Sequence, residues 1–82
     1  MDDLVDYYRP RKGDKVILNG TLYSKCTEDG IEGKTLYNHY CRIKNLKSFD
    51  YPHPILLSDS YTEQLGWVSF DDITPQREYK YV

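Results

Sequence analysis

The chain has 82 residues, enough for one domain with one small core and too few for a deep enzyme cleft. Eleven basic and thirteen acidic residues give a formal net charge of −2, which argues against nucleic acid as the main partner because phosphate binding needs a basic face. No apolar run is long enough to span a membrane, and the acidic residues 1–6 are unlike a signal peptide, so we expect synthesis in the cytoplasm.

The amino-terminal residues predict a short extension ahead of the main domain. Asp2 or Asp3 can cap a short helical turn, because their side-chain oxygens accept from the first backbone N–H groups. Pro10 ends this turn. We therefore expect residues 1–11 to form an N-terminal extension with a short helix.

The next segment predicts a hairpin. Residues 12–14 favour a turn and residues 15–18 a strand. Asn19-Gly20 follows, and this pair is a strong two-residue hairpin signal because both residues tolerate positive φ. Residues 21–24 are then expected to be the returning strand.

The middle of the chain alternates between polar loops and strands. Residues 25–34 are rich in glycine and charge and predict a loop. Residues 37–46 alternate apolar and polar side chains, as a half-buried strand does, and residues 55–58 predict a short buried strand. Pro52 and Pro54 stiffen the loop between these two strands.

The stretch from Leu65 to Ile73 predicts a last strand that runs into a single helical turn. Gly66 allows a sharp entry into the strand, and Trp67 must point to the face opposite Val68. Ser69 and Asp72 have capping-box spacing, and Pro75 should block any extension. Five short strands and one turn predict an all-β fold, a five-stranded, partly open barrel over residues 12–74 with a tail at 75–82.

The same residues resemble a known family. Six segments carry the resemblance: Gly13-Asp14-Lys15-Val16, Leu18-Asn19-Gly20-Thr21-Leu22-Tyr23, Gly33-Lys34, Tyr37 to Ile43, Tyr51-Pro52-His53-Pro54-Ile55 and Leu65-Gly66-Trp67-Val68. In this order they are similar to the bacterial SH3-like modules of peptidoglycan amidases and endolysins. The resemblance covers residues 12–73. It implies an SH3-like barrel that is not catalytic and that holds an enzyme on the cell wall. The barrel takes up most of these 82 residues, so we expect no catalytic domain within them.

The aromatic side chains are the main candidates for binding. Nine tyrosines, two phenylalanines and one tryptophan make up 15% of the chain, and tyrosine is enriched in binding surfaces. Rings at strand ends could line a shallow groove for a peptide or a sugar chain, or some of them could complete the small core. The resemblance also places the loop that contains His53 near the groove, although packing within that loop is the better explanation of this histidine. The candidate ligand-binding residues are Tyr23, Tyr37, Tyr40, Tyr51, His53 and Trp67.

Other clusters of polar residues are better explained by structural roles than by catalysis or metal binding. The spacing of Cys26, His39 and Cys41 matches no familiar metal site, and a Cys–His nucleophile would lack a pocket. Capping explains the pair of carboxylates at 71–72, and a solvated loop explains the acidic residues between 28 and 32. We therefore expect no enzyme, metal or cofactor.

The expected function is a non-catalytic module that recognises peptidoglycan or its peptide, with no nucleic acid and no membrane as partner. It would act at the cell wall or in a phage particle if another component carried it there. The alternative is a free-standing phage or mobile-element protein that uses the barrel to bind a protein partner, in virion assembly or in inhibition of a host factor.

Overall fold

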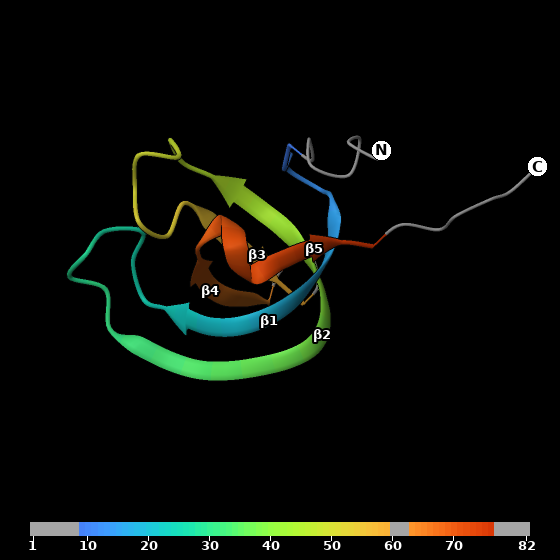
Figure 1. Cartoon of the computed structure of the whole chain (residues 1–82), viewed down its shortest axis with the longest axis horizontal. Helices are drawn as coiled ribbons and strands as arrows, with labels where there is room; N and C mark the ends of the chain where they lie inside the picture. Colours follow the sequence, from blue (N-terminus) through green and yellow to red (C-terminus); the bar gives the residue numbers. More distant parts are fainter. Residues whose placement is uncertain (1–8, 60–62, 77–82) are drawn as a thin grey trace, which may run out of the picture.

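The computed structural model describes residues 9–59 and 63–76 (Figure 1). In chain order the elements are β1 (Lys15–Tyr23), β2 (Glu32–Leu46), β3 (Ile55–Ser58), β4 (Gln64–Val68), the 3-10 turn η2 (Phe70–Asp72) and β5 (Ile73–Pro75). The helical turn expected within residues 1–11 falls largely on residues 1–8, outside the described part of the chain, as do residues 77–82 of the expected tail.

All strand pairs are antiparallel, and the sheet closes on itself. β1 pairs with β2, β2 with β3, β3 with β4, and β4 returns to β1 through the single pair Tyr23 and Trp67. β5 adds to β1 at Val16–Leu18. Because one residue pair makes the β1–β4 seam, the barrel is only partly closed. The predicted five-stranded, partly open barrel with a 3-10 turn before its last segment is confirmed.

The core consists of aliphatic side chains and one thiol. Inward positions alternate along the strands, as the pleat requires. They are occupied by Val16, Leu18, Leu22, Cys41, Ile43, Ile55, Leu57, Val68 and Ile73. None of the aromatic rings in the described ranges belongs to this core. The alternative that rings complete the core is therefore wrong for the described residues, because branched aliphatic groups already fill the narrow interior.

The hairpin at Asn19-Gly20 is contradicted. β1 runs unbroken through both residues, and neither has the positive φ that a two-residue hairpin turn needs. The pairing with β2 instead shifts register between Leu18 and Gly20, which marks a bulge. The Asn19 side chain accepts a hydrogen bond from the Asn38 backbone N–H at 2.9 Å. This pair of residues therefore bends a strand that continues, and the reversal comes later, between Tyr23 and Glu32.

Two further expectations need correction. β2 begins at Glu32 rather than at residue 37, so part of the expected loop at 25–34 is strand. The chain also continues past η2 into β5, which includes Pro75. Proline is tolerated there because this three-residue strand lies at the sheet edge, where a missing N–H breaks no ladder.

The turn expected before the last segment is present as η2, but its cap differs. Ser69 occupies the N-cap position with extended backbone angles, yet its side chain makes no capping hydrogen bond. The Asp72 N–H instead donates to the Ser69 carbonyl at 3.1 Å. Asp71 and Asp72 lie in the first turn, as predicted.

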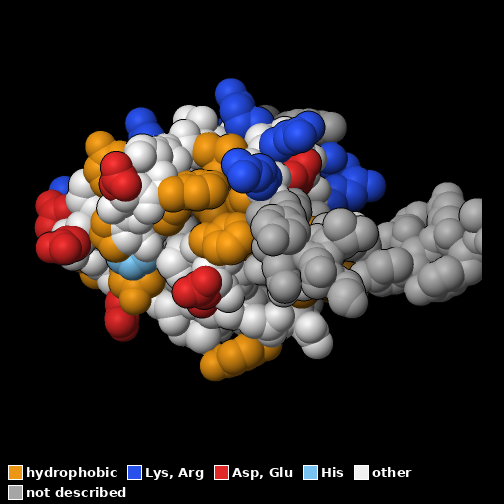
Figure 2. Space-filling view, turned by 45° about the horizontal axis from the view of Figure 1, so that its top comes forward, with side chains coloured by type: hydrophobic (Ala, Val, Ile, Leu, Met, Phe, Trp, Pro, Cys, Tyr) orange, Lys and Arg blue, Asp and Glu red, His pale blue; other side chains and the backbone are white. Residues whose placement is uncertain are grey.

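Charged side chains are separated on the surface. In the face shown in Figure 2, Lys and Arg gather towards the upper right, while most of the visible Asp and Glu lie elsewhere.

None of the helices in the described ranges has the length and apolar character needed to cross a membrane.

Candidate functional site

Three segments bring aromatic side chains to one end of the barrel. They are the end of β1, the loop at 47–54 between β2 and β3, and the stretch from β4 into η2. We call the rings that they contribute the aromatic site: Tyr23, Phe49, Tyr51, His53, Trp67 and Phe70. Four of its members, Tyr23, Tyr51, His53 and Trp67, are among the residues that the sequence predicts.

The centre of the aromatic site is a stack of Tyr23 on His53. The ring centroids lie 3.7 Å apart with an angle of 14° between the planes. The backbone N–H of His53 donates to the backbone carbonyl of Cys26 at 3.1 Å, which fixes the loop at 47–54 against the loop after β1. Nδ1 of His53 is buried and lacks a hydrogen-bond partner. His53 is thus a packed support behind Tyr23, and only the opposite face of the tyrosine ring is available to a ligand.

Trp67 lies beside Tyr23 on the outer face of the sheet. The two residues are the partners that join β1 to β4, and Val68, next to Trp67, points into the core. Trp67 is half-buried rather than enclosed. Cross-strand pairing therefore places the indole and the phenol on neighbouring strands at the same point of the seam.

Phe49 and Phe70 form a second aromatic pair that sequence reasoning missed. Their ring centroids are 6.0 Å apart, and the side chains are 55% and 40% exposed. They are the two phenylalanines of the chain. Phenylalanine has no polar atom that can hydrogen-bond to water, so the place of Phe49 in a predicted loop and of Phe70 in a predicted single turn was the signal that could have indicated a binding surface.

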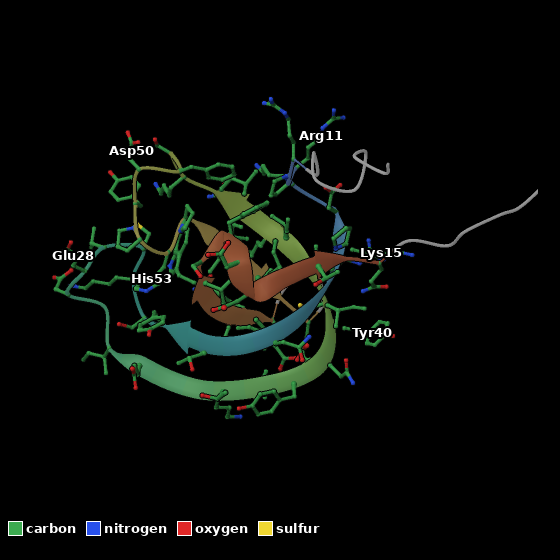
Figure 3. All side chains as sticks on the ribbon, in the orientation of Figure 1. Arg11, Lys15, Glu28, Tyr40, Asp50 and His53 are labelled. Atoms are coloured by element: carbon green, nitrogen blue, oxygen red, sulfur yellow. The ribbon has the colours of Figure 1, made fainter. Side chains whose placement is uncertain are left out.

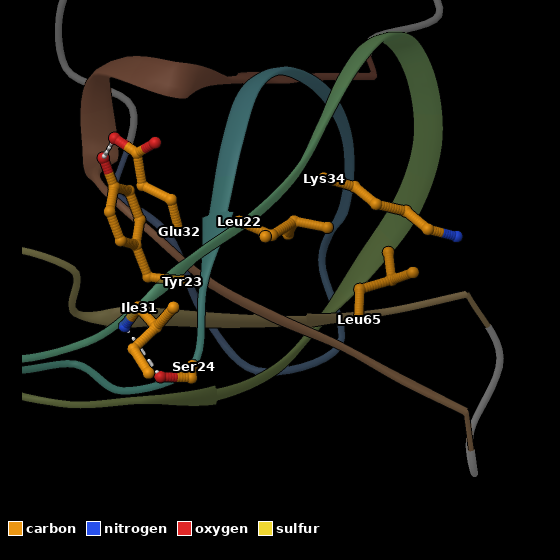
Figure 4. Close-up of a pocket in the computed structure, with 8 residues that line it drawn as sticks. Leu22, Tyr23, Ser24, Ile31, Glu32, Lys34 and Leu65 are labelled. Atoms are coloured by element: carbon orange, nitrogen blue, oxygen red, sulfur yellow. Dashed lines mark hydrogen bonds between the residues drawn. The ribbon is translucent and has the colours of Figure 1, made fainter.

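A hollow of about 470 Å³ adjoins the aromatic site (Figure 4). Leu22, Tyr23, Ile31 and Leu65 give it an apolar lining, and Glu32, Gly33, Lys34 and Ser24 complete it. Ile31 is 73% exposed, and the Tyr23 hydroxyl lies 3.5 Å from Glu32 Oε2. The hollow therefore offers an apolar floor with one carboxylate and one ammonium group in its lining, the features that suit a short zwitterionic chain.

The surroundings of this site are acidic. Figure 3 places Glu28 and Asp50 at the same end of the molecule as His53. Burial raises the pKa of Asp72, aided by the nearby Asp71 charge and opposed by a hydrogen bond with Ser69 and by His53. A hydrogen bond with Thr27, then one with Lys25, lowers the pKa of Asp29. These carboxylates favour a cationic group on the ligand.

The structure does not bring Tyr37 and Tyr40 to this site. Tyr37 is 75% exposed and adjoins Asn38, whose φ is +50°, at the bulge of β2. Tyr40 is 63% exposed, and Figure 3 shows it away from His53, near the Lys15 end. Tyr40 lines a separate, shallow hollow of about 190 Å³ with Lys15, Asp59 and Gln76.

The residues weighed for metal binding are also dispersed. Cys41 is in the core, and His39 Nε2 lies 2.6 Å from Asp59 Oδ1. Cys26 is in the loop that contacts His53. Over residues 9–59 and 63–76, no group of three His, Cys, Asp or Glu side chains is arranged to hold a metal ion.

Comparison with known proteins adds no relative: no protein-family model, curated protein or solved structure matches the chain.

Proposed function

We propose that this protein is a non-catalytic SH3-like binding module that holds a short peptide of the peptidoglycan type at its aromatic site. The observation that carries the proposal is that the described rings lie outside an aliphatic core, and that six of them come from three neighbouring segments. Removing apolar rings from water lowers the free energy, so rings that remain at the surface of the folded protein can stabilise a complex with a ligand.

The chemistry of the hollow favours a peptide with a free ammonium group. The free face of the Tyr23 ring can hold a cation, and Glu32 can pair with it. Lys34 offers a partner for a carboxylate, and Leu22, Ile31 and Leu65 can cover a small apolar side chain. Cell-wall stem peptides combine such amines, carboxylates and methyl groups.

Sedimentation with purified Gram-positive cell walls tests the proposal. We expect the wild-type protein to sediment with the walls, and Trp67→Ala and Phe70→Ala each to weaken binding about tenfold or more, as loss of an aromatic anchor does. Phe70 is 40% exposed, so its removal should leave the barrel folded. A circular dichroism melt of each variant checks this.

Tyr37→Ala is the matched control, because it removes a ring of the same kind that the structure places outside the aromatic site. It should bind walls as the wild type does. Equal losses in Tyr37→Ala and Trp67→Ala would contradict the assigned site. A folded wild-type protein that stays in the supernatant would overturn peptidoglycan as the ligand and favour a protein partner.

A further inference from the structure

The positive charge of this acidic protein is concentrated on one face. Seven of the nine described Lys and Arg residues lie at residues 9–15 and 42–47, where Asp14 is the one acidic residue of the two ranges. We call these two ranges the basic face. Figure 3 shows Arg11 and Lys15 at the side of the molecule opposite Glu28 and His53. The basic face therefore lies away from the aromatic site at Arg11 and Lys15, while its last residue, Lys47, begins the loop at 47–54.

Backbone pairing holds the two ranges of the basic face together. The Gly13 N–H donates to the Ile43 carbonyl at 2.8 Å, and the Ile43 N–H donates to the Asp14 carbonyl at 2.9 Å. Lys15 and Arg42 are cross-strand partners. Lys15, Arg42 and Lys44 are thus carried by strands, and the hydrogen bonds to Ile43 tie the turn that contains Lys12 to the sheet, which lowers the entropy lost when a ligand binds.

A hollow of about 290 Å³ lies within this face, lined by Lys12, Gly13, Arg42, Ile43, Lys44 and Ser58. The Ile43 side chain belongs to the core, so the exposed carbon of the hollow comes mainly from the methylene groups of the three long basic side chains. Its charged groups can extend to the rim. A ligand that fits must combine anionic groups with apolar surface.

We propose that the basic face binds an acidic peptide segment of a partner protein, with an apolar side chain of that segment in the hollow. Asp and Glu side chains would pair with the ammonium groups of Lys12 and Lys44. A phosphate polymer would also meet the charge, but it has no apolar group to place against the methylene groups that line the hollow. The acidic peptide satisfies both the charge and the lining.

Fluorescence anisotropy with a labelled peptide, in which Glu and Asp alternate with Leu, tests this inference. We expect saturable binding that Lys12→Glu and Lys44→Glu each weaken roughly five- to tenfold, because each replaces an attraction with a repulsion. A peptide with Ser in place of Leu should bind less tightly. The control Lys25→Glu makes the same change of net charge at the loop near His53, and should alter the affinity by less than about twofold.

Three outcomes would overturn the inference. The first is equal weakening by Lys25→Glu and Lys44→Glu, which would mean that net charge alone governs binding. The second is saturable binding of inorganic polyphosphate with no binding of the peptide. The third is a wild-type dimer in analytical ultracentrifugation that Lys44→Glu dissociates, which would make a second copy of this chain the occupant. Binding of the acidic peptide does not involve the aromatic site, so Phe70→Ala should leave the affinity for this peptide unchanged.

Discussion

Gly20 lies where β1 passes close to the carboxylate of Asp72. A Cβ atom at residue 20 would be 2.5 Å from Cγ and 2.6 Å from Oδ2 of that side chain. The contact joins β1 to η2, the turn that carries Phe70 into the aromatic site. Because Gly20 has no side chain beyond a hydrogen atom, η2 can approach β1 more closely than it could if residue 20 carried a methyl group.

Gly20→Ala should destabilise the protein by about 1–3 kcal/mol, because η2 must move to admit the methyl group. Urea denaturation followed by tryptophan fluorescence measures the change. In the background Asp72→Gly, which removes all three contacting atoms, the same substitution should cost much less. Equal costs in both backgrounds would show that the strain arises elsewhere.

Cys41 and Cys26 are free thiols in different surroundings. Burial, aided by the charge of Asp59, raises the pKa of Cys41 from 9.0 to about 11. At pH 8 only about one in a thousand Cys41 side chains is a thiolate, the reactive form. Iodoacetamide should therefore label Cys26 in the native protein and leave Cys41 unmodified, and label both in urea. Mass spectrometry of tryptic peptides reads the result, and rapid native labelling of Cys41 would contradict its burial.

The raised pKa of Cys41 also sets the sign of a pH dependence. The native state holds the thiol proton more tightly than the unfolded chain, so this group stabilises the fold below pH 9. That contribution is lost as the pH rises through about 11. Cys41→Ser removes the thiol's share of this pH dependence, so the urea midpoint of the wild type should fall more steeply above pH 9 than that of Cys41→Ser.

At the scale of elements, the alternation of apolar residues was sufficient to predict the class of fold. Residues 37–46 and 55–58 were recognised because inward and outward side chains differ in polarity. The hairpin predicted at Asn19-Gly20 is wrong because β1 pairs with β2 both before this pair, at Leu18, and after it, from Gly20 onward, and this pairing outweighs the local preference for a turn. Local signals decide a turn only where no neighbouring strand competes for the backbone.

The aromatic site was partly predictable for a related reason. Tyr23, Tyr51, His53 and Trp67 lie at strand ends or in a loop, which the sequence places correctly. Tyr37 and Tyr40 were grouped with them because they also follow a loop, but β2 begins earlier and extends past the site. Tyr37 and Tyr40 lie within the 15-residue strand β2, and it is their position along this strand, not their residue type, that keeps them out of the aromatic site.

Gly66 controls how β4 meets β1, and it gives a prediction at this scale. Its φ is +157°, and an added Cβ would be 3.1 Å from Leu22 Cβ and 3.2 Å from the Tyr23 carbonyl oxygen. Gly66→Ala should destabilise the barrel by about 1–3 kcal/mol and weaken wall binding, because it separates Tyr23 from Trp67.

Gly33→Ala is the matched control for this seam. Its Cβ would meet only the Leu22 carbonyl oxygen, at an ordinary 3.4 Å. We expect a change within about 0.5 kcal/mol. Amide hydrogen exchange at Tyr23 and Trp67 should accelerate in Gly66→Ala and not in Gly33→Ala; the reverse order would contradict the close packing of the seam.

Positive and negative side chains are concentrated in different parts of the molecule, although its net charge is only −2. Carboxylates surround the rings near His53, while most described cations lie on the basic face, so two ligands of opposite charge could occupy the barrel together. At 0.15 M ionic strength the screening length is about 8 Å, which is short on the scale of a folded domain. Each end should then act as an independent site.

Ionic strength tests this independence. At 0.15 M, Lys44→Glu should change the affinity of the aromatic site for an amine-bearing stem peptide by less than about twofold. At 0.01 M the screening length is about 30 Å, and the added negative charge should make binding of that cationic group measurably tighter. Isothermal titration at both salt concentrations measures the two effects. A larger coupling at high salt than at low salt would mean that the ends communicate through a change of barrel structure, since a field between charges can only weaken as salt is added.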